Sequence, residues 1–163
     1  MKLPCKIFVA ATTLIISSVS AFAQSSYYGV SPFEGIYAGA YVGGVLDPSA
    51  SATVGGVAGA NFAITDGIMV GAEVQAGATF DATTSYDALM LGHLGYEVDD
   101  QVMVYGALGA GIISGTGSYA IGGGAEAIVM DQLGVRGEIL GTGTWGGGPN
   151  AAKVTAGILW HVQ

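Results

Sequence analysis

Residues 68–80 read IMVGAEVQAGATF, and this stretch decides the fold because its side chains alternate in character. One set of alternate positions is entirely apolar, whereas the other includes Glu73 and Gln75. Successive side chains of a β-strand point to opposite faces, so the stretch predicts a strand with one apolar and one polar face. A short acidic turn at 66–67 precedes it, and a looser segment around Thr83 follows.

The same order of turn, strand and loop recurs along the chain about every 33 residues. Short turns stand at 66–67, 99–100 and 131–132, and looser Ser/Thr/Gly/Pro segments are centred near 49, 83, 116 and 149. Between them we expect eight strands, at roughly Glu34–Leu46, Ala52–Ile64, Ile68–Phe80, Ser85–Val98, Val102–Ile113, Ser118–Val129, Leu133–Trp145 and Ala152–Val162. Strands of this length, joined by short turns at one end and longer loops at the other, are typical of transmembrane barrels. The pattern predicts an all-β fold, an eight-stranded antiparallel up-and-down transmembrane β-barrel.

Residues 1–23 have the three parts of a secretory signal peptide. Lys2 and Lys6 form a positive start, an apolar stretch follows at 7–16, and Ala21-Phe22-Ala23 fits a cleavage site. We therefore expect a cleaved signal at 1–23, a short periplasmic segment at 24–33 and an outer-membrane barrel domain at 34–163. The only cysteine lies in the signal, so the mature chain has no thiol chemistry.

The charge of the chain excludes one class of partner. Beyond residue 23 there are twelve acidic residues and two basic ones, a formal charge of −10. Nucleic-acid binding needs clustered Lys and Arg, so no nucleic-acid partner is expected.

Charged residues on the polar faces of the strands must point into the barrel, because Arg or Lys in lipid costs about 2–4 kcal/mol at mid-depth. The expected lumen set is Glu73, Asp87, His93, Glu97, Glu126, Arg136 and Glu138. An eight-stranded barrel is filled by side chains, which favours a structural polar plug over an ion or proton path. In a hairpin symmetric about residue 131, Glu126 faces Arg136. We expect Arg136 to bridge Glu126 and Glu138.

The chain lacks the usual marks of catalysis or metal binding. His93 and His161 are the only histidines and do not form a spaced pair, and Gly141-x-Gly143-x-x-Gly146 ends a strand without opening a helix. We expect no catalytic residue, no metal site and no cofactor.

Four segments carry a family resemblance. They are Phe33–Gly39, Val70–Glu73, Val104–Gly109, and Gly122-x-Gly124-x-Glu126 with the later Arg136-x-Glu138. In order and spacing they resemble small opacity-type and OmpA-like outer-membrane barrels, with those of α-proteobacteria the best fit. The resemblance implies outer-membrane lipid, lipopolysaccharide, the outer-membrane assembly machinery and other envelope proteins as partners.

Together these features predict a Gram-negative outer-membrane barrel with a structural or interaction role, a narrow or plugged lumen and no catalysis. The alternatives are a cation-preferring, porin-like channel for small solutes and an outer-membrane lipid-modifying enzyme. A soluble lipocalin-like barrel is disfavoured by the outward apolar faces.

Overall fold

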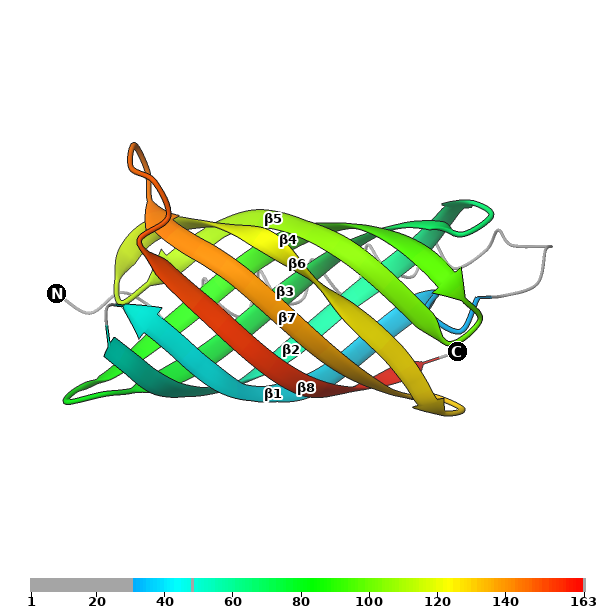
Figure 1. The fold of residues 1–163 in the computed structure, drawn as a ribbon, viewed down its shortest axis with the longest axis horizontal. Helices are drawn as coiled ribbons and strands as arrows, with labels where there is room; N and C mark the ends of the chain where they lie inside the picture. Colours follow the sequence, from blue (N-terminus) through cyan, green and yellow to red (C-terminus); the bar gives the residue numbers. More distant parts are fainter. Residues whose placement is uncertain (1–30, 48, 163) are drawn as a thin grey trace, which may run out of the picture. The chain divides into compact units, whose positions relative to one another are not determined.

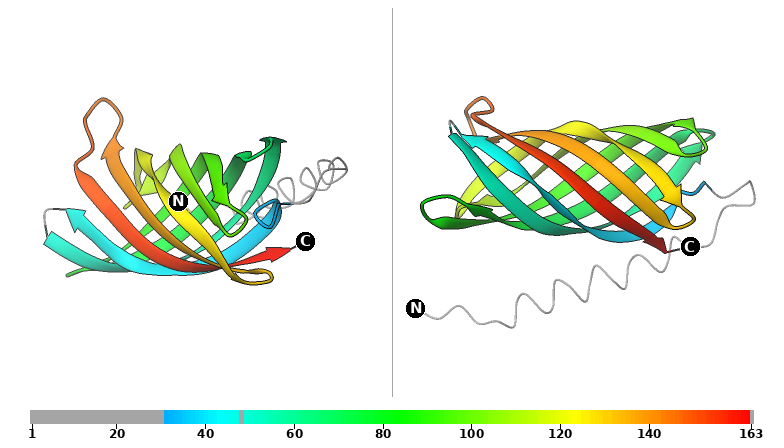
Figure 2. Two further views of the ribbon diagram at one scale, coloured as in Figure 1. Left: turned by 45° about the vertical axis from the view of Figure 1, so that its right-hand side comes forward. Right: turned by 60° about the horizontal axis from the view of Figure 1, so that its bottom comes forward.

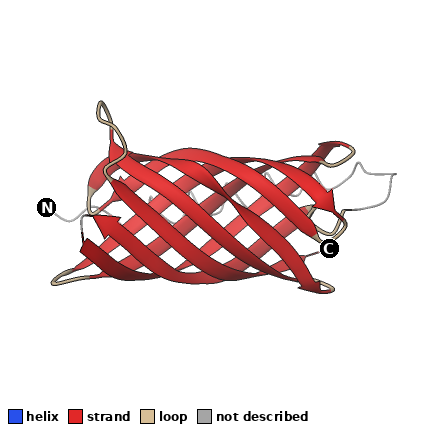
Figure 3. Cartoon of the chain, viewed as in Figure 1, coloured by secondary structure: helices blue, strands red, loops and turns tan. Residues whose placement is uncertain are grey.

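The computed structural model describes residues 31–162 apart from position 48, and these residues form one closed barrel (Figure 1). The expected signal peptide lies outside the described residues, as does all but the end of the expected periplasmic segment. The strands are β1 (Gly35–Asp47), β2 (Ser49–Thr65), β3 (Ile68–Phe80), β4 (Thr84–Asp99), β5 (Val102–Ile113), β6 (Thr116–Met130), β7 (Leu133–Thr144) and β8 (Ala151–Val162). Figure 3 shows that the described chain consists of strands and their connections. Among the described residues, no helix is long and apolar enough to cross a membrane.

Each strand pairs antiparallel with its neighbour in sequence, and β1 pairs with β8 to close the barrel. Both views of Figure 2 show β8 lying alongside β1. We call the end that carries the turns at 66–67, 100–101 and 131–132 the turn end. The opposite end, with the connections after β3, β5 and β7, is the loop end. The predicted fold class is confirmed.

Two connections at the loop end, those after β3 and after β5, are shorter than the sequence suggested. Between β5 and β6 only Ser114 and Gly115 remain outside the strands, and both have positive φ, at 51° and 79°. Two positive φ values in a two-residue turn match the twist of a β-hairpin, so pairing continues almost to the tip. The expected loop near 116 is therefore a tight turn, and β6 begins at Thr116 instead of Ser118.

The strand faces are those that the alternation predicts. In β3 the side chains of Met69, Glu73 and Gln75 are buried in the lumen, whereas Ile68 and Val74 are exposed on the outside. The same parity holds in β4 and β7, and it fixes which face of every strand meets the barrel interior.

Inward tyrosines pack against glycines that lie directly across the strand pairing. Tyr37 pairs with Gly59, and a Cβ on that glycine would come within 2.6 Å of the tyrosine ring. Tyr105 and Gly124 repeat the arrangement between β5 and β6, with a corresponding approach of 2.9 Å to the ring. The glycines make room for large rings inside a narrow barrel, which explains part of the high glycine content.

Candidate functional site: the closed lumen

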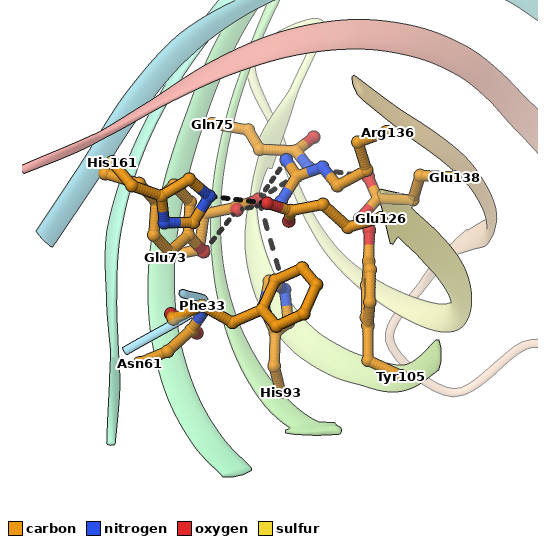
Figure 4. Close-up of polar contacts among 11 residues, drawn as sticks. Phe33, Asn61, Glu73, Gln75, His93, Tyr105, Glu126, Arg136, Glu138 and His161 are labelled. Atoms are coloured by element: carbon orange, nitrogen blue, oxygen red, sulfur yellow. Dashed lines mark hydrogen bonds and ion pairs between the residues drawn. The ribbon is translucent and has the colours of Figure 1, made fainter. Parts of the chain in front are cut away.

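The middle of the lumen holds a hydrogen-bonded group that we call the central cluster (Figure 4). Its members are Tyr37, Glu73, Gln75, Tyr105, Arg136 and Glu138, and they come from strands β1, β3, β5 and β7. The Arg136 guanidinium holds both oxygens of Glu73, with Nη1 at 2.6 Å from Oε2 and Nη2 at 3.1 Å from Oε1. This is the two-point geometry in which arginine binds a carboxylate most strongly.

The carboxylate oxygens of the cluster also accept hydrogen bonds from neutral donors, whereas the buried Gln75 Oε1 has no partner among the described residues. The Tyr37 hydroxyl donates to Glu73 Oε2 at 2.6 Å. The Gln75 amide nitrogen donates to Glu73 at 2.9 Å and to Glu138 at 2.6 Å, so it joins the two carboxylates. Tyr105 donates to the other Glu138 oxygen at 2.8 Å. Because every carboxylate oxygen has a donor, the cluster is a stable plug across the lumen and not a loose group of acids.

The predicted strand register is confirmed, but the predicted ion pair is wrong. Glu126 lies directly across from Arg136, and Gly124 lies across from Glu138, as expected for a hairpin symmetric about residue 131. The guanidinium nevertheless reaches over the lumen to Glu73, while the Glu126 carboxylate lies 2.5 Å from Nε2 of His161. In so narrow a barrel the opposite wall is within reach of an arginine, so adjacency in the sheet does not determine its partner.

Three side chains of metal-ligand type meet here: Glu73 and Glu138 of the central cluster, and His93 beside it. Oxygens of Glu73 and Glu138 and a ring nitrogen of His93 all lie within 4.8 Å of one another, a spacing that could hold a metal ion. However, each Glu73 oxygen already accepts two hydrogen bonds, so neither has a lone pair left for a metal. Arg136 already supplies the positive charge there. The donor geometry therefore fits a Glu73 carboxylate held by arginine better than it fits a metal centre.

The other expected lumen residues lie at different depths. Nε2 of His93 is buried 4.0 Å from Glu73 and has no hydrogen-bond partner among the described residues. Glu97 lies near the turn end and accepts a hydrogen bond from Ser31. Asp87 lies toward the loop end and pairs with Lys153.

A stopper that the sequence analysis missed closes the turn end. Residues 31–34 turn into the barrel mouth, and the Phe33 side chain is 0% exposed. Asn61 donates to the Phe33 carbonyl at 3.2 Å, and the phenylalanine ring meets His161 edge-on at 6.3 Å. Gly35, at a φ of 111°, allows the bend between the stopper and β1. No periodic pattern could reveal the stopper, because these residues precede the first strand.

The loop end is open and contains a cavity of about 380 Å³, which we call the cup. Lys153 and Asp87 line its inner part, with their charged atoms 2.8 Å apart, and Lys153 also donates to the Tyr41 hydroxyl at 2.9 Å. The alternation of β8 places Lys153 on the same inward face as Thr155. Nothing local in the sequence identifies its partner, which lies 66 residues away.

The outer surface of the barrel is apolar, in contrast to the polar lumen. Among the described residues, twenty-six large apolar side chains are exposed, and every strand contributes some of them. Arg136 and Lys153, the two basic residues in the described part of the chain, both point inward and are buried. A barrel with apolar side chains outside and charged ones inside is suited to hydrocarbon and not to water.

Comparison with known proteins supports this fold. A structure from the de novo design of transmembrane β-barrels has a TM-score of 0.56 and 23% identity, covering 79% of this chain and 97% of that one. Ail, the attachment invasion locus protein of Yersinia pestis, has a TM-score of 0.55 and 14% identity, covering 78% and 98%. The fold is that of an eight-stranded transmembrane β-barrel. No family model matches the sequence, and no curated protein matches it either.

Proposed function

We propose that this protein is a non-catalytic outer-membrane barrel whose lumen is closed, with a structural or interaction role in a Gram-negative envelope. The observation that carries the proposal is the contrast between the two surfaces: an apolar exterior around the whole circumference and an interior filled by hydrogen-bonded polar side chains. The likeness to Ail in fold adds support for the outer membrane.

Two separate closures favour a plugged lumen over a channel. The central cluster fills the middle, where the side chains of Glu73 and Arg136 are 0% and 6% exposed. The Phe33 stopper covers the turn end. A solute crossing the barrel would have to displace both, and separating a buried ion pair from its partners is costly.

The alternative of a cation-preferring channel rests on the acidic lumen, in which acids outnumber bases. The lipid-modifying enzyme has weaker support. Ser85, Ser114 and Ser118 line the cup, whereas His93 lies beside the central cluster and His161 contacts the stopper at the turn end. A serine nucleophile needs a base within hydrogen-bonding reach, and these groups lie in different parts of the barrel.

The remaining features of the proposal come from the sequence. They are a signal peptide at 1–23, membership of the opacity-type and OmpA-like barrels, and partners among lipopolysaccharide, the assembly machinery and envelope proteins. The apolar band supports contact with lipid.

Planar-bilayer recording tests the closed lumen. Purified, folded protein should show no large, steady conductance, and any small current should prefer cations because the lumen is acidic. Membrane flotation after a high-salt wash tests the location in parallel, because attachment through apolar area resists salt. A large, steady channel from the pure monomer would refute the plug, and release by salt would refute membrane insertion.

A further inference from the structure

The cup is a roomy part of the lumen, and the central cluster closes it beneath. Its volume of about 380 Å³ is in the range of small-molecule sites. The buried pair of Lys153 and Asp87 lies at its inner end, and the central cluster fills the barrel beyond. A solute entering from the loop end therefore meets a blind pocket, in which it can bind but from which it cannot pass on.

The wall of the cup is built mainly for hydrogen bonding. Nine of the eighteen lining residues are serine or threonine, and Asn150 adds an amide. Several of these groups come from rigid strands, and Ser118 and Thr142 are buried. Hydroxyl groups both donate and accept, so such a wall complements a ligand that carries several hydroxyl groups of its own.

The inner end of the cup offers a charged donor. The Lys153 side chain is 4% exposed and lines the cavity. Its ammonium group has three N–H donors, of which one goes to Tyr41 and one to Asp87. Within the described residues the third has no acceptor, so it can reach an oxygen atom of a ligand.

The charge of the cup favours a cationic ligand. Asp47, Asp81 and Asp87 line it together with Lys153, which leaves a net charge of −2. These three aspartates are not among the described groups whose ligand atoms lie within 4.8 Å of one another. Dispersed carboxylates suit an ammonium group on an extended molecule better than a single metal ion, which needs converging ligands.

We propose that the cup binds a small hydroxylated amine with the size and chemistry of an amino sugar. Its hydroxyl groups bond to the serine and threonine wall, one oxygen accepts from Lys153, and its ammonium lies near the aspartates at the mouth. None of the described residues that line the cavity is aromatic and able to stack on a sugar ring, so binding is weak and depends on hydrogen bonds and charge. This proposal depends on the barrel being closed by the pairing of β1 with β8. It does not depend on location in the outer membrane or on the absence of conductance.

Four probes separate the contributions of the hydroxyl groups and the charge. Chemical shifts of the protein folded in detergent micelles are followed during titration with glucosamine, glucose, 1,4-diaminobutane and glucuronate. Glucosamine should bind about tenfold more tightly than glucose, because a hydrogen bond to a charged group is worth roughly that factor over a neutral one. It should also bind more tightly than the diamine, and glucuronate should not bind.

Two variants test the location. Thr142→Val removes one buried hydroxyl without changing the side-chain volume, and Asp81→Asn removes one charge from the exposed mouth. Each should weaken glucosamine binding severalfold. The matched controls Thr65→Val and Asp99→Asn lie at the turn end and should leave binding unchanged.

The proposal fails if glucosamine shifts no cup resonances up to its solubility limit, or if the turn-end controls weaken binding as much as the cup variants do. Equal binding of glucose refutes the need for an amine, and equal binding of the diamine refutes the need for hydroxyl groups. Faster migration of unheated than of boiled protein verifies that each variant is folded. Bilayer conductance bears on the closed lumen alone, so the two proposals can fail separately.

Discussion

Arg136→Ala should destabilise the barrel by about 3–5 kcal/mol, because it leaves the buried Glu73 carboxylate without its cation. The wild-type guanidinium makes two hydrogen bonds to that buried carboxylate. The variant retains the hydrogen bonds from Tyr37 and Gln75, but neither donor carries a charge. The decrease in the free energy of unfolding should therefore match that measured when buried ion pairs are broken. It should exceed the decrease caused by losing one neutral hydrogen bond.

Urea unfolding from lipid vesicles measures this change, with the fluorescence of Trp145 and Trp160 as the signal. A double-mutant cycle then identifies the partner. Arg136→Ala combined with Glu73→Gln should show a coupling energy above about 1.5 kcal/mol, whereas the combination with Glu126→Gln should show less than about 0.5 kcal/mol. An unchanged urea midpoint in Arg136→Ala, or the stronger coupling to Glu126, would refute the assignment of partners across the lumen.

Three further predictions test the stopper, the lipid face and the strand packing. Phe33→Ala should make the turn end accessible to a small water-soluble thiol reagent at a cysteine introduced into the lumen there, and equal labelling in the parent would contradict the stopper. Leu108→Arg, in the middle of an outward face, should lower the free energy of unfolding in urea by about 2–4 kcal/mol. Val129→Arg, near a strand end, should lower it by only about 0–1 kcal/mol. Equal losses in the two variants would argue against a bilayer around the barrel. Gly109→Ala should destabilise by about 1–3 kcal/mol, because its Cβ would collide with the backbone of the facing strand. Gly137→Ala meets no atom within 4 Å and should stay within about 0.5 kcal/mol of the wild type in the same unfolding assay.

The local pattern of strand-forming and turn-forming residues predicts most of the fold. The expected bounds of β3 and β5 are those observed, because each strand runs without interruption between the turn or loop residues on either side. The pairing of Glu126 with Arg136 also follows from the sequence, since the turn between β6 and β7 sets the register of that hairpin. These features depend on residues that are close together in the chain.

Contacts across the lumen could not be predicted in the same way. Arg136 and Glu73 are 63 residues apart, and Lys153 and Asp87 are 66 apart. Whether such pairs meet depends on the diameter of the barrel and the stagger of all eight strands, which no single hairpin determines. The stopper at Phe33 is a further case, because it is held by tertiary contacts with β2 and β8 and not by a repeating pattern.

The seam between β1 and β8 differs in kind from the other seven. Those seven are hairpins between consecutive strands, whereas the seam joins Ile36 to Val162 across almost the whole described chain. Hairpins form in microseconds, but a contact so distant in sequence carries a larger loop-closure entropy. Closure of the seam should therefore be the last and slowest pairing, and until then both edge strands can pair with other chains. Because Ile36 and Val162 are paired neighbours, a circular permutant could join them through a short turn and begin instead at the connection between β4 and β5. All eight pairings would remain, but the late-closing edge would move to the opposite side of the barrel.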